Sequence, residues 1–320
     1  MKEQIGGKKC FITGGAGFIG SYLSETLLGQ GCSVTVYDNL VTGRMEWLAE
    51  CVTNQRFKFI QADLVDYRNL ESSMARHDIV WHFGANTNMV AGSKDPNVDF
   101  TNGLVATYNV LNAMKNSKIT ELLFPSSGAV YGDIARPPAS EEYGPLLPVS
   151  TYGAAKLSAE AWVSTYSHLY GIRSWIFRFG NVLGARMTHG VIFDLLAKLR
   201  ASNKELEVLG DGSGEKNYFL VEECISGMLY AYNHSNHVGC EIFNLGSEST
   251  TRVSEIVRII LEETGNTQAR IRYAGGERGW PGDQPRVYMS VEKMKKLGWS
   301  AKLKSDDAVR LAVRRYIGKA

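Results

Sequence analysis

The chain has 320 residues, of which 44% are hydrophobic and 21% are charged, and its formal net charge is +2. This length allows a large buried core in one α/β domain or in two closely associated ones. The small net charge gives no electrostatic reason to expect nucleic acid or an anionic membrane as a partner.

The cysteines and the N-terminal segment indicate which kinds of protein can be excluded. The five cysteines are scattered and form no CxxC pair, so we expect buried free thiols without a metal site or a disulfide framework. No run approaches the roughly 18 to 20 apolar residues that span a bilayer. The start of the chain has no signal-peptide cleavage pattern. We therefore expect a cytoplasmic protein that does not act at a membrane.

Short β-branched or aromatic runs alternate with helical patterns through the first half of the chain. Helical patterns such as 18–30 and 98–116 lie between the runs. The predicted strands are residues 9–13, 33–38, 57–61, 78–83, 121–126 and 174–179. This alternation predicts a Rossmann-type, doubly wound parallel sheet with helices on both faces, an α/β fold.

The alternation loosens after about residue 180, where glycine-rich loops separate the helical patterns. We predict that residues 1–180 form the sheet domain, with some later segments returning to it. Residues 181–320 are predicted to form a smaller C-terminal lobe. The helices predicted in this half are residues 191–202, 221–234, 253–264 and 305–317.

A glycine-rich turn follows the first predicted strand and opens a helix. Gly14 allows the tight turn, Gly17 lets the backbone approach a pyrophosphate, and Gly20 lets the helix pack close to the strand. Asp38 ends the second strand, where a carboxylate can accept both ribose hydroxyls of NAD and repel the 2′-phosphate of NADP. The pattern predicts a NAD site. The alternatives are a plain glycine turn with Asp38 as a helix cap, and NADP, which only Arg44 favours.

Further dinucleotide contacts are expected where the other strands end. Asp63 ends the third strand, where it can meet the adenine amino group or simply cap the next helix. The remaining candidates are Phe18, Ile19, Asn39, Leu40, Gly43, Leu64, Phe83, Gly84, Ala85 and Phe179.

Tyr152 and Lys156 are spaced four residues apart on a predicted helix, which puts both side chains on one face. A cationic lysine near a phenol lowers the pKa of the phenol, and this can prepare Tyr152 to exchange a proton with a hydroxyl group. Ser127 follows a strand at the carboxyl edge of the sheet, where ligands of such sheets bind. We predict that Ser127, Tyr152 and Lys156 are catalytic. A surface helix is the alternative interpretation of this spacing when it occurs alone.

These motifs, in this order, resemble the extended short-chain dehydrogenase/reductase family, and most of all its nucleotide-sugar epimerases of the UDP-glucose 4-epimerase type. The resemblance runs from Cys10 to about Ile317. It implies that NAD stays tightly bound and is recycled, and that Tyr152 acts as the base. It also implies that Lys156 holds the nicotinamide ribose and that the sugar passes through a 4-keto state.

The resemblance also implies substrate contacts in the second half of the chain. Asn181 lies in a stretch similar to the R-x-x-N-V-x-G of the family and would contact the diphosphate. Lys216 and Arg278 would neutralise phosphate charge, with solvated surface charge as the alternative for both. Gly103 departs from the family, which has an asparagine there that orders the active-site lysine; either Asn102 substitutes through a local shift or the support is missing. The other substrate candidates are Asn86, Ser127, Tyr152, Val191, Val208 and Tyr218.

Gly128 and Ala129 discriminate among the reactions of the family. Relatives that dehydrate or decarboxylate sugars resemble one another in placing acidic residues after the serine, and none stands here. We therefore favour C4 epimerisation of a nucleotide-sugar. A nucleotide-sugar reductase or dehydrogenase that releases its cofactor, and a silent NAD-binding scaffold, are the alternatives. The sugar can be glucose/galactose, an N-acetylated form or a uronic acid, each carried on UDP or another nucleotide.

Family resemblance further implies a homodimer through a four-helix bundle, formed by helices near 98–116 and 152–170. Apolar side chains at helical spacing are consistent with such a seam, although packing against the sheet explains them equally well. The positions are Val105, Tyr108, Leu111, Trp162, Tyr166 and Leu169.

Overall fold

The computed structural model describes residues 5–319, which divide into two compact units. The units interleave along the chain, because each one is built from separated segments. Unit 1 comprises the chain up to Ser127, Thr151–Arg178 and Met228–Phe243; unit 2 comprises Gly128–Ser150, Phe179–Gly227 and the chain from Asn244 onward.

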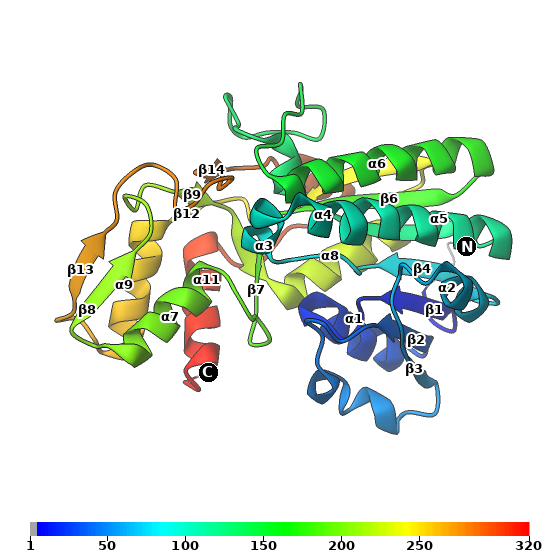
Figure 1. The fold of residues 1–320 in the computed structure, drawn as a ribbon, viewed down its shortest axis with the longest axis horizontal. Helices are drawn as coiled ribbons and strands as arrows, with labels where there is room; N and C mark the ends of the chain where they lie inside the picture. The colour runs from blue at the N-terminus through cyan, green and yellow to red at the C-terminus, as the bar shows by residue number, and fades with distance from the viewer. Residues whose placement is uncertain (1–4, 320) are drawn as a thin grey trace. The chain divides into compact units, whose positions relative to one another are not determined.

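A parallel sheet of seven strands, counted over the described residues, forms the centre of unit 1 (Figure 1). Its order is β11-β6-β5-β4-β1-β2-β3, so the chain order reverses between β1 and β4. Ligands of doubly wound sheets bind beside such a reversal, at the carboxyl ends of the strands. The predicted doubly wound sheet is confirmed. Its strands are β1 (Lys9–Thr13), β2 (Ser33–Asp38), β3 (Phe57–Gln61), β4 (Ile79–His82), β5 (Glu121–Ser127), β6 (Arg173–Phe179) and β11 (Cys240–Leu245).

Helices cover the sheet of unit 1. Figure 1 shows α5 and α6 side by side, and buried residues such as Met114, Phe124 and Val163 join them to the strands. The helix α8 (Val221–His234) begins in unit 2 and ends in unit 1. The other helices of unit 1 are α1 (Phe18–Gly29), α2 (Tyr67–Met74), α3 (Met89–Lys94), α4 (Pro96–Asp99), α5 (Ala106–Ser117) and α6 (Thr151–Tyr170), with short 3-10 turns η1 (Met45–Leu48) and η2 (Cys51–Thr53).

The single helix expected over residues 98–116 is wrong in detail. A π-helical segment, η3 (Phe100–Val105), separates α4 from α5. Gly103 lies in this segment, and a Cβ added to it would come within 2.9 Å of the Cβ of Ala155 on α6. The absence of a side chain therefore allows the widened turn to pack closely against α6. A local hydrophobic pattern does not report this because it depends on the neighbouring helix.

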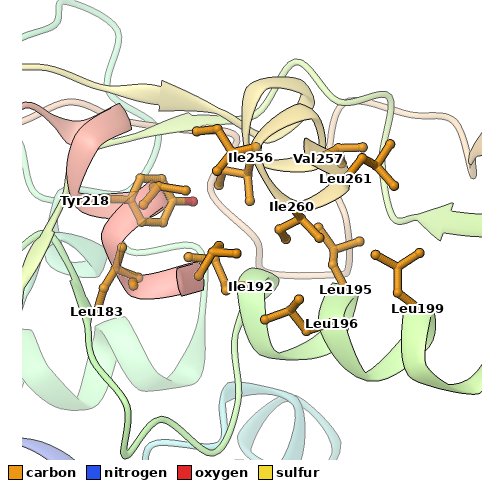
Figure 2. Packing of buried hydrophobic residues seen from close by; sticks show 14 of the residues in the cluster. Leu183, Ile192, Leu195, Leu196, Leu199, Tyr218, Ile256, Val257, Ile260 and Leu261 are labelled. Atoms are coloured by element: carbon orange, nitrogen blue, oxygen red, sulfur yellow. The ribbon is translucent and has the colours of Figure 1, made fainter. Parts of the chain in front are cut away.

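Unit 2 is a smaller arrangement of short strands around helices. Its core packs α7 (Val191–Ala201), α9 (Val253–Thr264) and α11 (Ser305–Tyr316) through side chains such as Leu195 and Ile260 (Figure 2). The predicted helices of this half agree with the observed ones to within one residue. The remaining elements are η4 (Gly128–Tyr131), β7 (Asn181–Leu183), β8 (Glu205–Val208), β9 (Glu215–Lys216), β10 (Tyr218–Leu220), β12 (Thr251–Arg252), β13 (Arg270–Tyr273), β14 (Arg286–Val287) and α10 (Glu292–Leu297).

Cysteines, metal-binding clusters and membrane spans can be judged over residues 5–319. Within this range the five cysteines are free thiols, and four of them are buried. No group of histidine, cysteine or acidic side chains in the range has the arrangement needed to hold a metal ion. No helix in it combines the length and apolar character needed to cross a bilayer.

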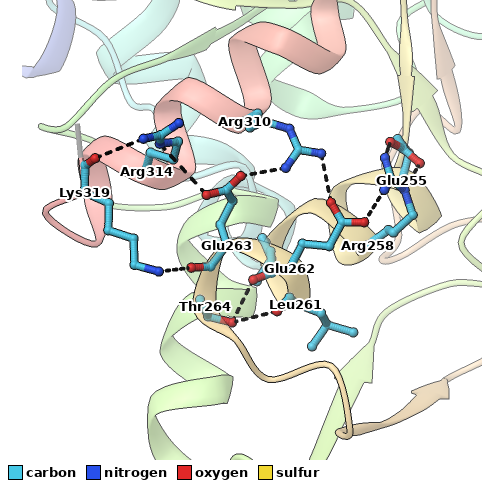
Figure 3. Close-up of polar contacts among 10 residues, drawn as sticks. Glu255, Arg258, Leu261, Glu262, Glu263, Thr264, Arg310, Arg314 and Lys319 are labelled. Atoms are coloured by element: carbon cyan, nitrogen blue, oxygen red, sulfur yellow. Dashed lines mark hydrogen bonds and ion pairs between the residues drawn. The ribbon is translucent and has the colours of Figure 1, made fainter.

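A chain of ion pairs joins the outer faces of α9 and α11 in unit 2. Arg258 pairs with Glu255 and Glu262, and Arg310 joins Glu262 to Glu263 at 2.9 Å and 2.6 Å (Figure 3). Exposed pairs of this kind each contribute about 0 to 1 kcal/mol, because water screens them. The apolar core beneath the pairs therefore accounts for most of the packing energy between these helices.

The comparison of core with surface gives the first prediction. We expect Ile260→Ala to lower the free energy of unfolding by about 2 to 5 kcal/mol, because it leaves a cavity in a fully buried core. Glu262→Gln on the same helix should cost less than about 1 kcal/mol. Urea denaturation followed by circular dichroism measures both. A larger loss for Glu262→Gln would show that the ion-pair network, and not the core, holds α9 to α11.

Candidate active site

The turn between β1 and α1 has room only for glycine at its tightest points. Gly14 has a left-handed φ of +67°, and a Cβ there would lie 2.6 Å from the backbone nitrogen of Gly84. A Cβ on Gly20 would collide with the carbonyl oxygen of Gly14. Both glycines therefore bring backbone segments into direct contact, which is the role predicted for them.

The N-terminus of α1 has the features of a phosphate site. Gly17 is its N-cap, and no described side chain caps the helix there. A Cβ on Gly17 would meet only the Gly14 carbonyl oxygen, at 3.1 Å, so the space in front of this residue is otherwise open. The first backbone N–H groups of the helix, at Phe18 and Ile19, are thus available to an anion. The turn fits the pyrophosphate of a dinucleotide.

The carboxylate of Asp38 is fixed at the end of β2. It accepts hydrogen bonds from the backbone N–H groups of Ala16, at 3.0 Å, and Leu40, at 2.8 Å. Burial raises the pKa of Asp38, and the two backbone hydrogen bonds oppose that rise. A Cβ on Gly43 would lie 2.8 Å from the same carboxylate, so this glycine also adjoins it. Leu40, whose N–H makes the second of these hydrogen bonds, adopts a left-handed φ of 61°, a conformation that is unfavourable for a residue with a Cβ.

Asp63 lies near Asp38 but is engaged locally. Its carboxylate accepts hydrogen bonds from the Asn39 side chain, at 2.8 Å, and from the backbone N–H of Val65, at 3.1 Å. The helix α2 is capped by Asp66, so the alternative interpretation of Asp63 as its cap is wrong. A Cβ on Gly84 would meet the side chain of Leu64 at 2.5 Å. These contacts bring the ends of β2, β3 and β4 together beside the glycine turn. Phe83 and Ala85 flank Gly84 in the chain.

The three predicted catalytic residues meet within unit 1. The Ser127 side chain, at the end of β5, hydrogen-bonds to the phenol of Tyr152 near the start of α6. The ammonium of Lys156 donates to the carbonyl oxygen of Pro125 at 2.7 Å. It also lies 4.9 Å from the ring centroid of Phe124 and 6.0 Å from that of Tyr152. Strand β5 and helix α6 thus bring these three residues together in one corner, the predicted catalytic corner.

The pKa of Tyr152 differs from the sequence-based expectation. Burial raises it to about 12 and the charge of Asp99 adds to the rise, while the Ser127 hydrogen bond lowers it. Burial also lowers the pKa of Lys156 to about 8. Burial outweighs the predicted lowering of the Tyr152 pKa by the lysine, whose ammonium donates to the carbonyl oxygen of Pro125 instead. Near neutral pH, Tyr152 keeps its proton and Lys156 keeps its charge.

Asn102 does not take the place of the asparagine missing at Gly103. Its side-chain amide donates to the carbonyl oxygen of Val98 at 2.9 Å, within its own helical segment. The carbonyl of Pro125 holds the ammonium of Lys156 instead. No side-chain pattern predicts this support, because it comes from the backbone.

Asp99 is a buried residue of the site that the sequence reasoning missed. It accepts hydrogen bonds from the Asn86 side chain, at 2.7 Å, and from the Thr151 hydroxyl, at 2.6 Å. Asn86 also donates to the carbonyl oxygen of Asn88 and accepts from its backbone N–H. The side chain of Asn86, a predicted substrate contact, is therefore engaged within its loop. The sequence signal that could have identified Asp99 is its position: an acidic residue on the apolar side of a predicted helix.

Two predicted phosphate-binding cations of unit 2 meet at one aspartate. Lys216 forms an ion pair with Asp283 at 2.8 Å, and Arg278 donates to the backbone carbonyl oxygen of the same residue. Arg278 also pairs with Asp133 at 2.7 Å. The glycine-rich loop at 275–283 thus brings Arg278 beside Lys216. Both cations have acidic partners in this structure.

The other predicted substrate contacts divide between core and partly exposed positions. Tyr218 and Val208 are buried in the core of unit 2, so their side chains are not open to a ligand. Val191 packs against the same core at the start of α7. Asn181 is partly exposed on β7, and its backbone N–H donates to the carbonyl oxygen of Asn217 at 2.8 Å. Phe179, a predicted cofactor contact, is buried in unit 2.

Comparison with known proteins agrees with this arrangement. The model of the NAD-dependent epimerase/dehydratase family matches residues 10–246. The chain is 31% identical to a putative UDP-glucose 4-epimerase of Methanocaldococcus jannaschii over 94% of its own length and 96% of that protein. A crystal structure of a UDP-galactose 4-epimerase is 34% identical, with a TM-score of 0.87, covering 97% of this chain and 99% of the other. The UDP-glucuronic acid 4-epimerase of Bacillus cereus, solved with UDP-glucuronic acid and NAD, is 26% identical, with a TM-score of 0.87 and coverage of 97% and 99%.

The family match covers more than half of the chain and includes the glycine turn, Asp38 and the Ser127–Tyr152–Lys156 corner. NAD is the cofactor of this family, and the turn before α1 fits it. The chain belongs to the NAD-dependent epimerase/dehydratase family of extended short-chain dehydrogenases/reductases.

Proposed function

We propose that this enzyme inverts C4 of a nucleotide-sugar of the UDP-glucose/UDP-galactose type through a transient 4-keto sugar. The observation that carries the proposal is the hydrogen bond between Ser127 and Tyr152, with the ammonium of Lys156 buried beside them. This arrangement can move one proton to and from a hydroxyl group. NAD, when bound, supplies the hydride acceptor and donor for the same carbon.

Each residue of the corner has a role in this reaction. Tyr152 takes the proton of the C4 hydroxyl as the phenolate while the carbon is oxidised, and as the phenol it returns that proton when the carbonyl is reduced. Ser127 hydrogen-bonds to the reacting oxygen and keeps it near the phenol. The positive charge of Lys156 favours the phenolate and binds the nicotinamide ribose, as in the family that the chain resembles.

Gly128 and Ala129 support epimerisation over dehydration. Removal of water from the sugar requires an additional acid and base near C5 and C6, and neither position after Ser127 carries an ionisable group. Proton transfer at C4 then rests on Tyr152. We propose that unit 2 binds the diphosphate through Asn181, Lys216 and Arg278, and that the two cations would exchange their acidic partners for phosphate oxygens.

The direct test is incubation of the purified enzyme with a panel of nucleotide-sugars, with the products resolved by NMR. We expect interconversion of the C4 epimers without added NAD, because the cofactor stays bound and is regenerated in each turnover. Net consumption of added NAD(P)H with a reduced sugar as product would favour a reductase instead. Tyr152→Phe should abolish turnover and leave dinucleotide binding nearly unchanged, and retained activity would reject Tyr152 as the base.

Lys156→Met should separate stability from activity. Burial lowers the pKa of Lys156 from 10.5 to about 8, so the charged form is disfavoured in the folded protein by about 3 kcal/mol, at about 1.4 kcal/mol per pH unit. We expect the variant to lose turnover and yet to be as stable as the parent, or more stable, at neutral pH.

The sign of the pH effect can be tested as well. Between pH 8 and 10.5 the unfolded chain binds a proton at Lys156 that the folded chain does not, so the stability of the parent rises relative to the variant. Urea midpoints measured across this range follow the difference. A gap between parent and variant that stays constant with pH would contradict the lowered pKa.

We also propose that two copies of the chain associate through α5 and α6 as a four-helix bundle. Tyr108 and Trp162 pack edge to face at 5.3 Å, yet Trp162 is 40% exposed and Leu169 is 61% exposed. Leu111 and Tyr166 of the predicted seam instead belong to the core of unit 1. Exposed aromatic and aliphatic side chains gathered on paired helices are typical of an interface.

The dimer is tested by one charged substitution on this face. Trp162→Glu should convert the dimer to a monomer in sedimentation analysis, because it places an unpaired charge in the seam. Val238→Glu is a matched control at a fully exposed apolar position of unit 1 outside the two helices, and it should leave the dimer intact. A parent enzyme that sediments as a monomer would contradict the proposal.

A further inference from the structure

A buried charged cluster lies behind the catalytic corner of unit 1. It consists of Ser126 on β5, Glu160 on α6 and Arg178 on β6, and each side chain is at most 5% exposed. Such burial of two charges is costly unless the pair is well oriented and its remaining hydrogen bonds are satisfied. The cluster therefore requires an explanation beyond surface solvation.

The geometry of the cluster is that of a bidentate pair. The Nε of Arg178 donates to Oε1 of Glu160 at 3.0 Å, and its Nη2 donates to Oε2 at 2.7 Å. The hydroxyl of Ser126 donates to Oε1 as well. Glu160 thus connects the catalytic helix to the carboxyl ends of two neighbouring strands.

The cluster adjoins the catalytic residues along both the helix and the strand. Glu160 follows Lys156 by four residues, as Lys156 follows Tyr152, so the three share one face of α6. Ser126 stands between Pro125, whose carbonyl holds the ammonium of Lys156, and the catalytic Ser127. A displacement of Ser126 would move both neighbours.

We propose that Glu160 is a positioning residue of this enzyme. It fixes the end of β5 through Ser126, and its negative charge offsets the positive charges of Lys156 and Arg178. The proposal rests on the proposed function for its catalytic consequence. It assigns to Glu160 no contact with substrate or cofactor.

The charges around Lys156 show why Glu160 matters. Its carboxylate raises the pKa of Lys156 and so opposes the effect of burial. His82 on β4 is neutral, since burial lowers its pKa to about 3, and Asp99 acts on Tyr152 from the other side. Without Glu160, the guanidinium of Arg178 and the ammonium of Lys156 would both stay buried without the anion that now offsets their charges.

The test is Glu160→Gln, which keeps the shape of the side chain and removes its charge. We expect turnover at neutral pH to fall at least tenfold with little change in KM, and the alkaline limb of the pH–rate profile to move to lower pH by about one unit. The double variant Glu160→Gln/Arg178→Gln removes both charges. It should move the alkaline limb most of the way back to its position in the parent, because a neutral pair can replace a buried ion pair. If the single variant does not fold, the double variant and its comparison with Arg178→Gln carry the test.

Glu121→Gln is the matched control. Glu121 is the first residue of the same strand β5 and pairs with Lys8 at 2.7 Å, far along the strand from the catalytic end. This variant should leave the pH–rate profile in place. Loss of stability in Glu160→Gln with an unmoved alkaline limb would overturn the proposal and leave Glu160 a purely structural residue.

A readout without substrate separates this inference from the proposed function. The stability difference between Glu160→Gln and Glu160→Gln/Lys156→Met should begin to rise at a lower pH than the difference between the parent and Lys156→Met, because the pKa of Lys156 is lower. An onset at the same pH would reject the role of Glu160. Failure of the parent to interconvert any sugar would reject the proposed function alone.

Discussion

A lysine held out of water is the constraint on which the catalytic corner depends. Lys156 is 6% exposed, and a backbone carbonyl and an aromatic face replace the water that its ammonium has lost. Such replacement is incomplete, which is why the pKa of the lysine falls to about 8. A charge in this setting acts strongly on its neighbours because little solvent screens it. Keeping a cation beside Tyr152 therefore lowers the stability of the folded protein.

The cofactor side of unit 1 is ordered in advance by backbone contacts. Gly14 and Gly20 bring the turn into van der Waals contact with its surroundings, and two N–H groups fix the carboxylate of Asp38. A ligand that meets groups already in place loses less conformational freedom on binding. Because these contacts belong to β1, α1 and β2, the same packing that forms the sheet also forms the site. Fold and cofactor site are thus not separable in this chain.

Much of this was predictable from the sequence, and the exceptions share a physical cause. Strands such as 9–13 and 33–38 were predicted to the residue, because strands buried in a parallel sheet appear as continuous β-branched and aromatic runs bounded by turns. The π-helical turn at Gly103, the burial of Tyr218 and the high pKa of Tyr152 were not, because each depends on what a distant segment places against the residue. The spacing of residues along one helix can be read from the sequence, but the burial of those residues by other segments, which sets their pKa values, cannot.

The groups around Tyr152 act on its pKa in opposite directions. The proposed epimerisation takes a proton from one sugar and returns it to its epimer at the same oxygen, so Tyr152 would have to act as the phenolate in the first step and as the phenol in the second. Burial and Asp99 favour the phenol and raise the pKa of Tyr152 to about 12, whereas the Ser127 hydrogen bond favours the phenolate. A dehydratase would instead need a separate acid, which Gly128 does not provide. The proposed inversion needs only one tyrosine that exchanges a single proton, whereas loss of water would need a second ionisable group.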